Sequence, residues 1–519
     1  MSTSEDGGFA AGMRRVAGSW RLGSVVLLSF SSGLPLGLVW LAIPAWMARE
    51  GVDIKVIGLF TLAQAPWSFK LLWSPSMDRY PLPLLGRKRG WILAGQVGLL
   101  ATTLWLAGAA RQPEAIWVIG GLALAIAFAS ATQDIAIDAY AVETLRREEL
   151  GFASGARTAF YRFAMLVAGG ISITLAAETS WVLVNALLAL LYLPFMVVTW
   201  LAPEPEDLPP PPRSLREAVW GPFVGFLAQH RSLEILAFVV LYKLGDNLTQ
   251  SLTRPFLVQA GFDDFDVGVA TATIGQAASI AGTLVGGILT DRMGLGRALW
   301  VFGFFQLVSN LGYAVVAEVG VNRPVMYAAQ AFELGSSGLG QGAFGVLLMR
   351  LTQKRFSATQ YALLSSLFTL PRILAGPVSG VLADRLGWRD FFVLTVAFGV
   401  PGLLMLARFV PWGVRDVEFE VKAPSWGPPL ARRALAWRSV LGGVLALAAG
   451  LAAVGLVGGL SGLRAGRGFA LGPALAAVLR PGSVGEWTTS IGLLVLAALG
   501  GLATAATLAA RRGLAARGE

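Results

Sequence analysis

Long apolar segments alternate with short polar breaks along nearly the whole chain. Each apolar segment is close to the roughly 20 residues that a helix needs to cross the hydrocarbon core of a bilayer. The segments predicted to span the membrane are residues 23–47, 56–74, 90–109, 115–140, 152–176, 180–201, 232–257, 266–290, 298–316, 324–349, 358–383, 390–411, 439–462 and 488–510. The pattern therefore predicts an all-α polytopic membrane protein with fourteen transmembrane helices.

The longest polar break before the C-terminal region divides the first twelve spans into six plus six. It contains four consecutive prolines at 209–212, which cannot continue a helix and favour an extended spacer. Apolar residues at Leu215, Val219, Phe223 and Phe226 then predict an amphipathic helix along the membrane surface. We expect an N-terminal six-helix bundle at 1–201, a cytoplasmic linker at 202–231, a C-terminal six-helix bundle at 232–411, a second cytoplasmic linker at 412–437 and an accessory two-helix hairpin at 438–519.

The last two spans follow the six-plus-six arrangement and carry no internal charge. Gly442, Ala446 and Gly450 follow one another at four-residue spacing. Small residues at this spacing let two membrane helices pack closely. We therefore expect a hairpin that packs against itself or its neighbours and is peripheral to transport.

Composition narrows the chemistry that the chain can perform. Hydrophobic residues make up 55% of the sequence and charged residues 14%, against about 25% charged in soluble proteins. There is no cysteine, and the single histidine, His230, lies in the polar linker. We predict no metal site and no cofactor, and no catalytic motif points to an enzyme. Any proton relay has to use carboxylates.

The formal net charge of +10 is explained by membrane topology. With the N-terminus inside the cell, most lysines and arginines fall in cytoplasmic connections, as the positive-inside rule requires. Both termini are then cytoplasmic. The basic charge needs no nucleic-acid partner, and we expect a monomer in the lipid bilayer.

Two similar polar loops occupy corresponding places in the two halves. One contains Asp78, Arg79 and Arg87, and the other contains Asp291 and Arg292. An aspartate at a helix end, followed by arginines, can hold neighbouring helix ends in one gate conformation; alternatively, the cations only set topology. The stretch GGILTDRMGLGR, together with the six-plus-six layout, resembles the major facilitator superfamily, which implies that fold for the first twelve spans.

Ionisable residues inside the spans are functional candidates, because each costs roughly 2.5–3.5 kcal/mol to insert. They are Lys70, Asp134, Asp138, Arg162, Lys243, Asp246, Glu333 and Arg372. We expect Asp134, Asp246 or Glu333 to carry the proton. Lys243 and Asp246 can instead neutralise each other. Arg162 and Arg372 occupy matching places in the repeat, and we favour structural pairing for Arg162 and substrate contact for Arg372.

The stretch SATQDIAIDAYAVETL places three carboxylates at the end of one span. Asp134 falls inside the hydrocarbon core and Asp138 at its cytoplasmic boundary, whereas Glu143 lies beyond it. We therefore interpret Asp134 as the first choice for protonation. We expect Asp138 to close the inner gate with Arg162 or a loop arginine, and Glu143 to be a solvated helix-end charge.

Five stretches in the first 140 residues resemble the AmpG-type anhydromuropeptide permeases. They are FSSGLPLGL, EGVDIKVIGLF, KLLWSPSMDRY, GRKRGW and ATQDIAIDA. The resemblance implies a proton-driven importer of N-acetylglucosamine–anhydro-N-acetylmuramic acid, with or without stem peptide, in the bacterial inner membrane. It also implies a role in peptidoglycan recycling and β-lactamase induction.

A muropeptide carries carboxylates and many hydroxyls, so its site needs cations, amides and aromatic faces. The residues that can supply them are Trp40, Lys70, Gln133, Tyr242, Lys243, Asn247, Gln250, Gln330 and Arg372. Parts of the same stretches also resemble acetyl-coenzyme A transporters and siderophore importers. A membrane receptor or scaffold without transport is the alternative from a different class.

Overall fold

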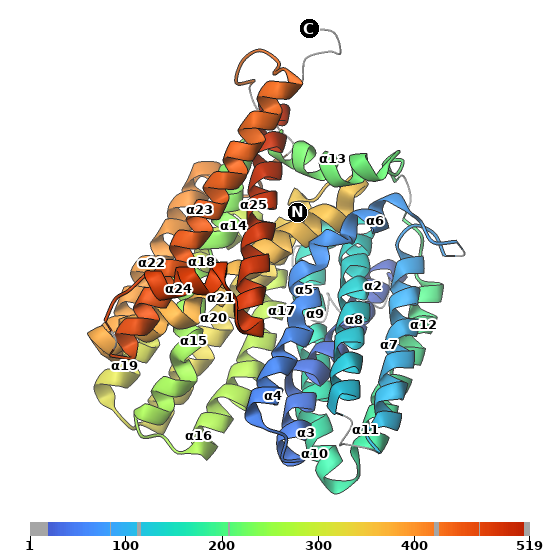
Figure 1. Cartoon of the computed structure of the whole chain (residues 1–519). Helices are drawn as coiled ribbons and strands as arrows, with labels where there is room; N and C mark the ends of the chain where they lie inside the picture. Colours follow the sequence, from blue (N-terminus) through green and yellow to red (C-terminus); the bar gives the residue numbers. More distant parts are fainter. Residues whose placement is uncertain are drawn as a thin grey trace, which may run out of the picture.

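The computed structural model describes residues 19–83, 85–111, 116–205, 208–419, 425–466 and 468–512. Their regular structure is helical, and most helices run side by side along one direction (Figure 1). The predicted all-α class is confirmed. The end of the molecule that carries the loops with Asp78 and Asp291 is called the loop end below; it lies at the top of Figure 1, where α13 crosses the bundle.

The first six predicted spans form the N-terminal half. The helices are α2 (Trp20–Gly37) with η1 (Leu38–Ala42) and α3 (Ile43–Arg49); α4 (Ile54–Leu59), η2 (Phe60–Gln64), α5 (Ala65–Phe69), η3 (Lys70–Leu72) and α6 (Ser74–Arg79); α7 (Arg89–Ala109); α8 (Ile116–Thr144); η4 (Arg147–Glu149), α9 (Leu150–Leu166), η5 (Val167–Ile171) and α10 (Ser172–Glu178); α11 (Trp181–Leu190) and α12 (Tyr192–Leu201).

The linker helix α13 (Leu215–Leu227) leads into the C-terminal half. That half contains α14 (Ser232–Leu241) and α15 (Leu244–Gln259); α16 (Asp264–Gly268), η6 (Val269–Ile274) and α17 (Gly275–Met293); α18 (Leu295–Ser309) and α19 (Leu311–Val319); α20 (Arg323–Leu351); η7 (Lys354–Phe356) and α21 (Ser357–Leu386); and α22 (Trp388–Phe409). The last part is α23 (Arg432–Arg464), α24 (Gly472–Leu479) and α25 (Val484–Arg512).

Ten helical segments in the described ranges are long and apolar enough to cross a membrane. They coincide with ten of the fourteen predicted spans. The other four, at 56–74, 232–257, 324–349 and 358–383, are helical but broken or more polar. Each of these four contains candidate ionisable residues, which are Lys70, Lys243 with Asp246, Glu333 and Arg372.

Two buried lysines lie at breaks in the helices of predicted spans. Pro66 and Pro75 stand in the first turns of α5 and α6, where the missing N–H of proline does no harm. Lys70 lies between these helices, in η3. Lys243 occupies the junction between α14 and α15, with φ −103° and ψ 9°. Each lysine therefore stands where a span is interrupted rather than in a continuous helix.

The two halves approach each other closely where α9 crosses α17. A Cβ atom added to Gly287 would lie 2.3 Å from the Gly151 carbonyl oxygen, and one added to Gly155 would lie 2.6 Å from the Thr283 carbonyl oxygen. Only glycine fits at such a distance, so backbone meets backbone across the halves. This crossing lies toward the loop end.

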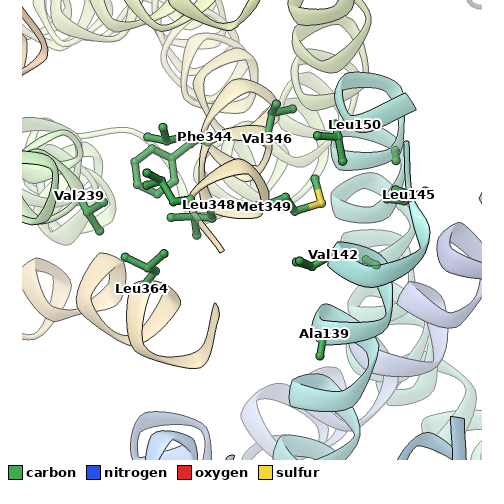
Figure 2. Packing of buried hydrophobic residues seen from close by; sticks show 14 of the residues in the cluster. Ala139, Val142, Leu145, Leu150, Val239, Phe344, Val346, Leu348, Met349 and Leu364 are labelled. Carbon is green, nitrogen blue, oxygen red and sulfur yellow. The ribbon is translucent and has the colours of Figure 1, made fainter. Parts of the chain in front are cut away.

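An apolar cluster also joins the halves near the loop end (Figure 2). Val142 of α8 and Leu150 just beyond it lie on the N-terminal side, and Val346 and Met349 of α20 lie opposite. Leu364 of α21 belongs to the same cluster, and all five side chains are buried. Water is therefore excluded from the space between the halves at this level.

The last two long helices, α23 and α25, pack against each other through small residues. A Cβ atom on Gly442 would lie 2.0 Å from Thr504 Oγ1, and one on Gly500 would lie 2.3 Å from the Ala446 Cβ. At the loop end, the Arg511 guanidinium donates to the carbonyl of Gln229 at 3.0 Å. The predicted close packing is seen, and the pair is attached to the start of the C-terminal half. That it is peripheral to transport stays a prediction.

Candidate functional site

Helix α8 places Gln133 and Asp134 inside the N-terminal half, and both side chains are buried. The Ser32 hydroxyl of α2 donates a hydrogen bond to the Asp134 carboxylate. The Ser31 hydroxyl donates to Gln133 Oε1 at 3.4 Å. Among the described residues, Asp134 forms no ion pair within 4 Å. This acid therefore faces a hydroxyl group of a neighbouring helix instead of a cation.

Asp138 lies one turn further along α8 and is paired with two cations. Its carboxylate accepts a hydrogen bond from Arg157 of α9 at 2.6 Å, and the Lys70 ammonium lies 3.8 Å away. Arg157 also donates to the Ser29 hydroxyl at 3.1 Å. Asp138 thus connects α8 with α9 and with the broken second span.

The expectation that Arg162 or a loop arginine pairs with Asp138 is wrong. Arg157 and Arg162 are five residues apart on α9, so their side chains leave the helix in different directions. Arg162 donates to Gln341 Oε1 of α20 at 2.7 Å. Arg162 therefore contacts the opposite half, and Asp138 is held by Arg157, which is absent from the predicted set.

In the C-terminal half, Lys243 and Asp246 pair directly. The Lys243 ammonium lies 2.9 Å from Asp246 Oδ2 and donates to Ser337 Oγ of α20 at 3.0 Å. Asp246 stands in the first turn of α15, where the helix dipole favours a negative charge. Both side chains are buried, and their charges neutralise each other. Mutual neutralisation requires this contact, and a substrate or proton role for either residue stays a prediction.

A second acid of this half lies beside that pair. Glu333 of α20 is buried and accepts a hydrogen bond from the Gln250 amide of α15 at 2.8 Å. Gln250 Nε2 also lies 3.5 Å from Ser337 Oγ. Gln330, one turn before Glu333, accepts from the Tyr313 hydroxyl at 2.7 Å. Helices α15 and α20 therefore bring Gln250 and Glu333 together, whereas Gln330 faces α19.

Two other predicted substrate residues lie on or near α15. The Tyr242 ring stacks on Phe344, with ring centroids 5.5 Å apart, and its hydroxyl accepts from Gln306 at 3.3 Å. Tyr242 is thus part of the apolar core and contacts α18. Asn247 is half-buried and has no hydrogen-bond partner for its side chain in the described ranges.

A cation–π contact joins an arginine of the C-terminal half to a tryptophan of the N-terminal half. The Arg372 guanidinium of α21 lies 5.9 Å from the centre of the Trp40 ring of η1, a cation–π distance. Trp67 of α5 meets Trp40 edge to face, with ring centroids 6.1 Å apart. Trp67 was absent from the predicted set, although it lies three residues before Lys70 in the same broken span.

Several buried polar atoms in these groups have no protein partner. They include Trp40 Nε1, Trp67 Nε1, Gln133 Nε2 and Glu333 Oε2. A buried polar atom without a hydrogen bond costs about 1–3 kcal/mol. The four side chains belong to η1, α5, α8 and α20, which are parts of the first, second, fourth and tenth spans. A polar molecule bound between the halves is one way to satisfy such atoms.

At the loop end, Asp78 binds the start of a helix from the opposite half. Its carboxylate accepts the backbone N–H groups of Ala358 and Thr359 at 3.1 and 2.9 Å, and the Thr359 hydroxyl at 2.7 Å. The Lys88 ammonium lies 2.6 Å from the same carboxylate. Asp78 is buried and satisfies the free N–H groups at the N-terminus of α21.

Asp291 makes the corresponding contact in the other direction. Its carboxylate accepts the backbone N–H groups of Gly151 and Phe152, both at 2.8 Å, at the N-terminus of α9. Each loop aspartate therefore caps a helix of the other half. This exchange repeats the same capping geometry once in each direction between the halves.

The loop arginines are placed differently from one another. Arg87 donates to the Arg355 carbonyl of the opposite half at 2.6 Å and to the Pro209 carbonyl at 3.1 Å. Arg79 lies over the ring of its neighbour Tyr80. Arg292 is exposed. Within the described ranges, Arg87 thus contacts the opposite half, whereas the side chains of Arg79 and Arg292 do not.

The sequence profile of the Major Facilitator Superfamily matches residues 25–370, which cover most of both halves. The chain belongs to the major facilitator superfamily. The superfamily that the six-plus-six layout and the paired loops suggested from the sequence is confirmed by that match. The chain is therefore a multi-pass membrane protein with the transporter fold of this superfamily.

Individual relatives agree with this assignment. The chain is 43% identical over 384 residues to the anhydromuropeptide permease of Escherichia coli (strain K12), covering 74% of this chain and 78% of the permease. It is 34% identical over 395 residues to an uncharacterized protein of Haemophilus influenzae, covering 74% and 92%. The solved structure of the proton:xylose symporter XylE bound to 6-bromo-6-deoxy-D-glucose shares the fold, with a TM-score of 0.59, 11% identity and coverage of 76% and 97%.

The prediction that Glu143 is a solvated helix-end charge is wrong. Its side chain is buried, and it accepts a hydrogen bond from the Ser357 hydroxyl of the opposite half at 2.6 Å. Lys88 and Arg87 each lie 3.8 Å from the same carboxylate. The start of α21 covers this end of α8, which a helical wheel of α8 alone cannot reveal. Glu143 thus belongs to the cluster around Asp78.

Replacing Glu143 with glutamine is expected to destabilise the protein. The variant keeps a hydrogen-bond acceptor for Ser357 but leaves buried cationic charge of Lys88 and Arg87 less compensated. The expected loss is about 1–3 kcal/mol, measured as a lower midpoint of thermal unfolding in detergent. The exposed Glu148→Gln has the same charge change and is expected to be neutral. Equal midpoints for both variants would show that the buried charge of Glu143 is unimportant.

Proposed function

We propose that this chain imports anhydromuropeptides, N-acetylglucosamine–anhydro-N-acetylmuramic acid with or without stem peptide, across the bacterial inner membrane by proton symport. The observation that carries the proposal is the 43% identity with the E. coli permease over 78% of its length. Both termini are then cytoplasmic, as is the loop end. The cargo crosses the membrane without chemical change, so the chain is a transporter and not an enzyme.

The groups between the halves suit such a cargo. Trp40 and Trp67 offer aromatic faces for sugar rings, and Arg372 offers a charge for a carboxylate of the lactyl group or stem peptide. The free amide donor of Gln133 can bind a sugar hydroxyl or acetamide oxygen. Trp40 and Arg372 belong to opposite halves. A cargo that binds to these two residues therefore contacts both halves at once and can influence how the halves move.

Proton coupling is best placed on an acid that lacks a directly paired cation. Asp246 is bonded to Lys243, and Asp138 is bonded to Arg157, so each of these carboxylates already has a cation as its partner. In the part of the chain that the structure describes, Asp134 and Glu333 accept hydrogen bonds from neutral groups, those of Ser32 and Gln250. A buried carboxyl in that setting is the group that most readily exchanges a proton. Asp134 is our first choice, with Glu333 as the second.

The loop-end contacts then act as the inner gate. Asp78, Asp291, Glu143 and Arg87 tie the halves together on this side, and the apolar cluster of Figure 2 excludes water behind them. Rocking of one half against the other breaks these contacts and opens the cytoplasmic side. The arrangement described here is thus the one in which cargo enters from the periplasm.

Cargo identity is tested by competition in proteoliposomes that contain the purified chain. Uptake of labelled N-acetylglucosamine–anhydro-N-acetylmuramic acid is expected, and excess unlabelled muropeptide is expected to suppress it. Acetyl-coenzyme A and a ferric siderophore are expected to leave it unchanged. Liposomes without protein set the background. Uptake of either competitor in place of the muropeptide would contradict the proposed cargo, and binding without uptake would indicate a receptor.

A further inference from the structure

A cavity of about 650 Å³ lies outside the transport site, between the linker helix α13 and the last two long helices, α23 and α25. Residues of all three helices line it, and these helices meet near the loop end (Figure 1). Its lining combines charge with apolar surface and includes Arg216, Trp220, Arg432, Leu435, Ser439 and Ala505. Neither the family fold nor the proposed transport reaction requires it.

The two arginines of this cavity have no acidic partner in the described part of the chain. Arg216 and Arg432 are both exposed and form no ion pair there. The acid next to Arg216, Glu217, is already engaged by the Arg355 guanidinium at 2.5 Å and by the Arg213 backbone N–H at 2.7 Å. The cavity therefore presents two guanidinium groups whose positive charges are not neutralised by a described acidic residue and can bind an anionic ligand.

The surroundings of the arginines favour a lipid over a free anion. Leu215 and Val219 expose apolar side chains along α13. Val440 and Val444 are also exposed on α23, on a face of the helix next to the one that lines the cavity. A tryptophan such as Trp220 is typical of the level of lipid headgroups. A phosphate held by the arginines thus has apolar helix surface beside it for acyl chains.

We propose that α13, α23 and α25 form a binding site for an anionic phospholipid, with Arg216 and Arg432 holding its phosphate. Guanidinium groups suit phosphate because they offer several donors in one plane. Basic pockets between membrane helices bind anionic headgroups for the same reason. The acyl chains lie against the exposed apolar face of α23.

Helix α13 connects this site to the inner gate. The Pro222 carbonyl accepts a hydrogen bond from Gln360 at 2.9 Å, and the Gly225 carbonyl accepts one from Gln353 at 3.3 Å. Both glutamines belong to the start of α21 or the turn before it, next to the N–H groups that Asp78 caps. A lipid that fixes α13 against α23 therefore also steadies the helix end that closes the gate.

The test measures lipid binding to the purified full-length chain in detergent, by native mass spectrometry with added phosphatidylglycerol or phosphatidylcholine. Phosphatidylglycerol is expected to be retained, and the double variant R216A/R432A is expected to lose about tenfold or more of this binding. The matched control R213A/R433A removes the same charge from arginines outside the cavity and is expected to bind normally. Millimolar inorganic phosphate is expected not to displace the lipid.

Three results would overturn the proposal. They are equal retention of the two lipids, unchanged binding in R216A/R432A, and full displacement by inorganic phosphate, which would indicate a site for a soluble anion. If the double alanine variant does not fold, R216Q and R432Q measured singly serve the same purpose. The readout needs no transport, so failure of the proposed muropeptide import leaves the result interpretable.

Discussion

Replacing Asp134 with asparagine is expected to abolish gradient-driven accumulation of cargo while sparing exchange of cargo across the membrane. Asparagine keeps the size of the side chain and can accept the Ser32 hydrogen bond, but it cannot take up a proton. A pH difference of one unit supplies about 1.4 kcal/mol per proton, or roughly tenfold accumulation of a cargo carried with one proton. The variant is expected to reach a ratio near one.

The measurement compares two assays on the same proteoliposomes. Net uptake under an imposed pH gradient reports coupling, and counterflow with equal pH on both sides reports movement of the loaded carrier. Asp264→Asn, an exposed aspartate of α16, is the matched control and is expected to behave like the wild type. Full accumulation by Asp134→Asn would move the coupling site to Glu333, and loss of both activities would indicate a role in folding or binding.

Replacing Asp78 with alanine is expected to open the loop end of the protein. The substitution removes the cap of α21 and leaves the buried Lys88 without its nearest partner. Loss of a helix cap costs about 0.5–2 kcal/mol, and removal of one member of a buried ion pair costs about 3–5 kcal/mol. These energies are large enough to shift the population strongly toward the inward-open arrangement, with a loss of transport of at least about tenfold.

Because the chain has no cysteine, opening can be followed with a single introduced thiol. Met349→Cys places it in the buried apolar cluster between the halves (Figure 2). Labelling by a water-soluble maleimide is expected to be slow in the otherwise wild-type chain and fast after Asp78→Ala. Asp384→Ala, an exposed aspartate at the far end of α21, is the control and is expected to leave labelling slow. Equal labelling rates in all three chains would contradict the gate.

The sequence was most informative where the signal is local. Apolar runs, the polar break at 202–231 and the paired loops around Asp78 and Asp291 each lie within a short stretch, and they were sufficient to predict the helical class and the superfamily. The four-residue spacing of Gly442 and Ala446 likewise predicted the close contact that α23 makes with α25.

Partners of individual side chains could not be predicted in the same way. Asp78 and Thr359 are bonded across 281 positions of the chain, and Glu143 and Ser357 across 214. A helical wheel gives the direction of a side chain on its own helix but not the neighbouring helix that it meets. For this reason the sequence alone predicts that Glu143 is in contact with water and that Arg162 lies beside Asp138. Trp67 and Arg157 were overlooked for the same reason.

The most direct test of the account is uptake of labelled N-acetylglucosamine–anhydro-N-acetylmuramic acid by proteoliposomes with an acidic exterior. The account predicts accumulation above the external concentration that disappears when a protonophore collapses the gradient. Accumulation that is unaffected by the protonophore would contradict proton symport. Uptake no greater than in protein-free liposomes would contradict transport of this cargo altogether.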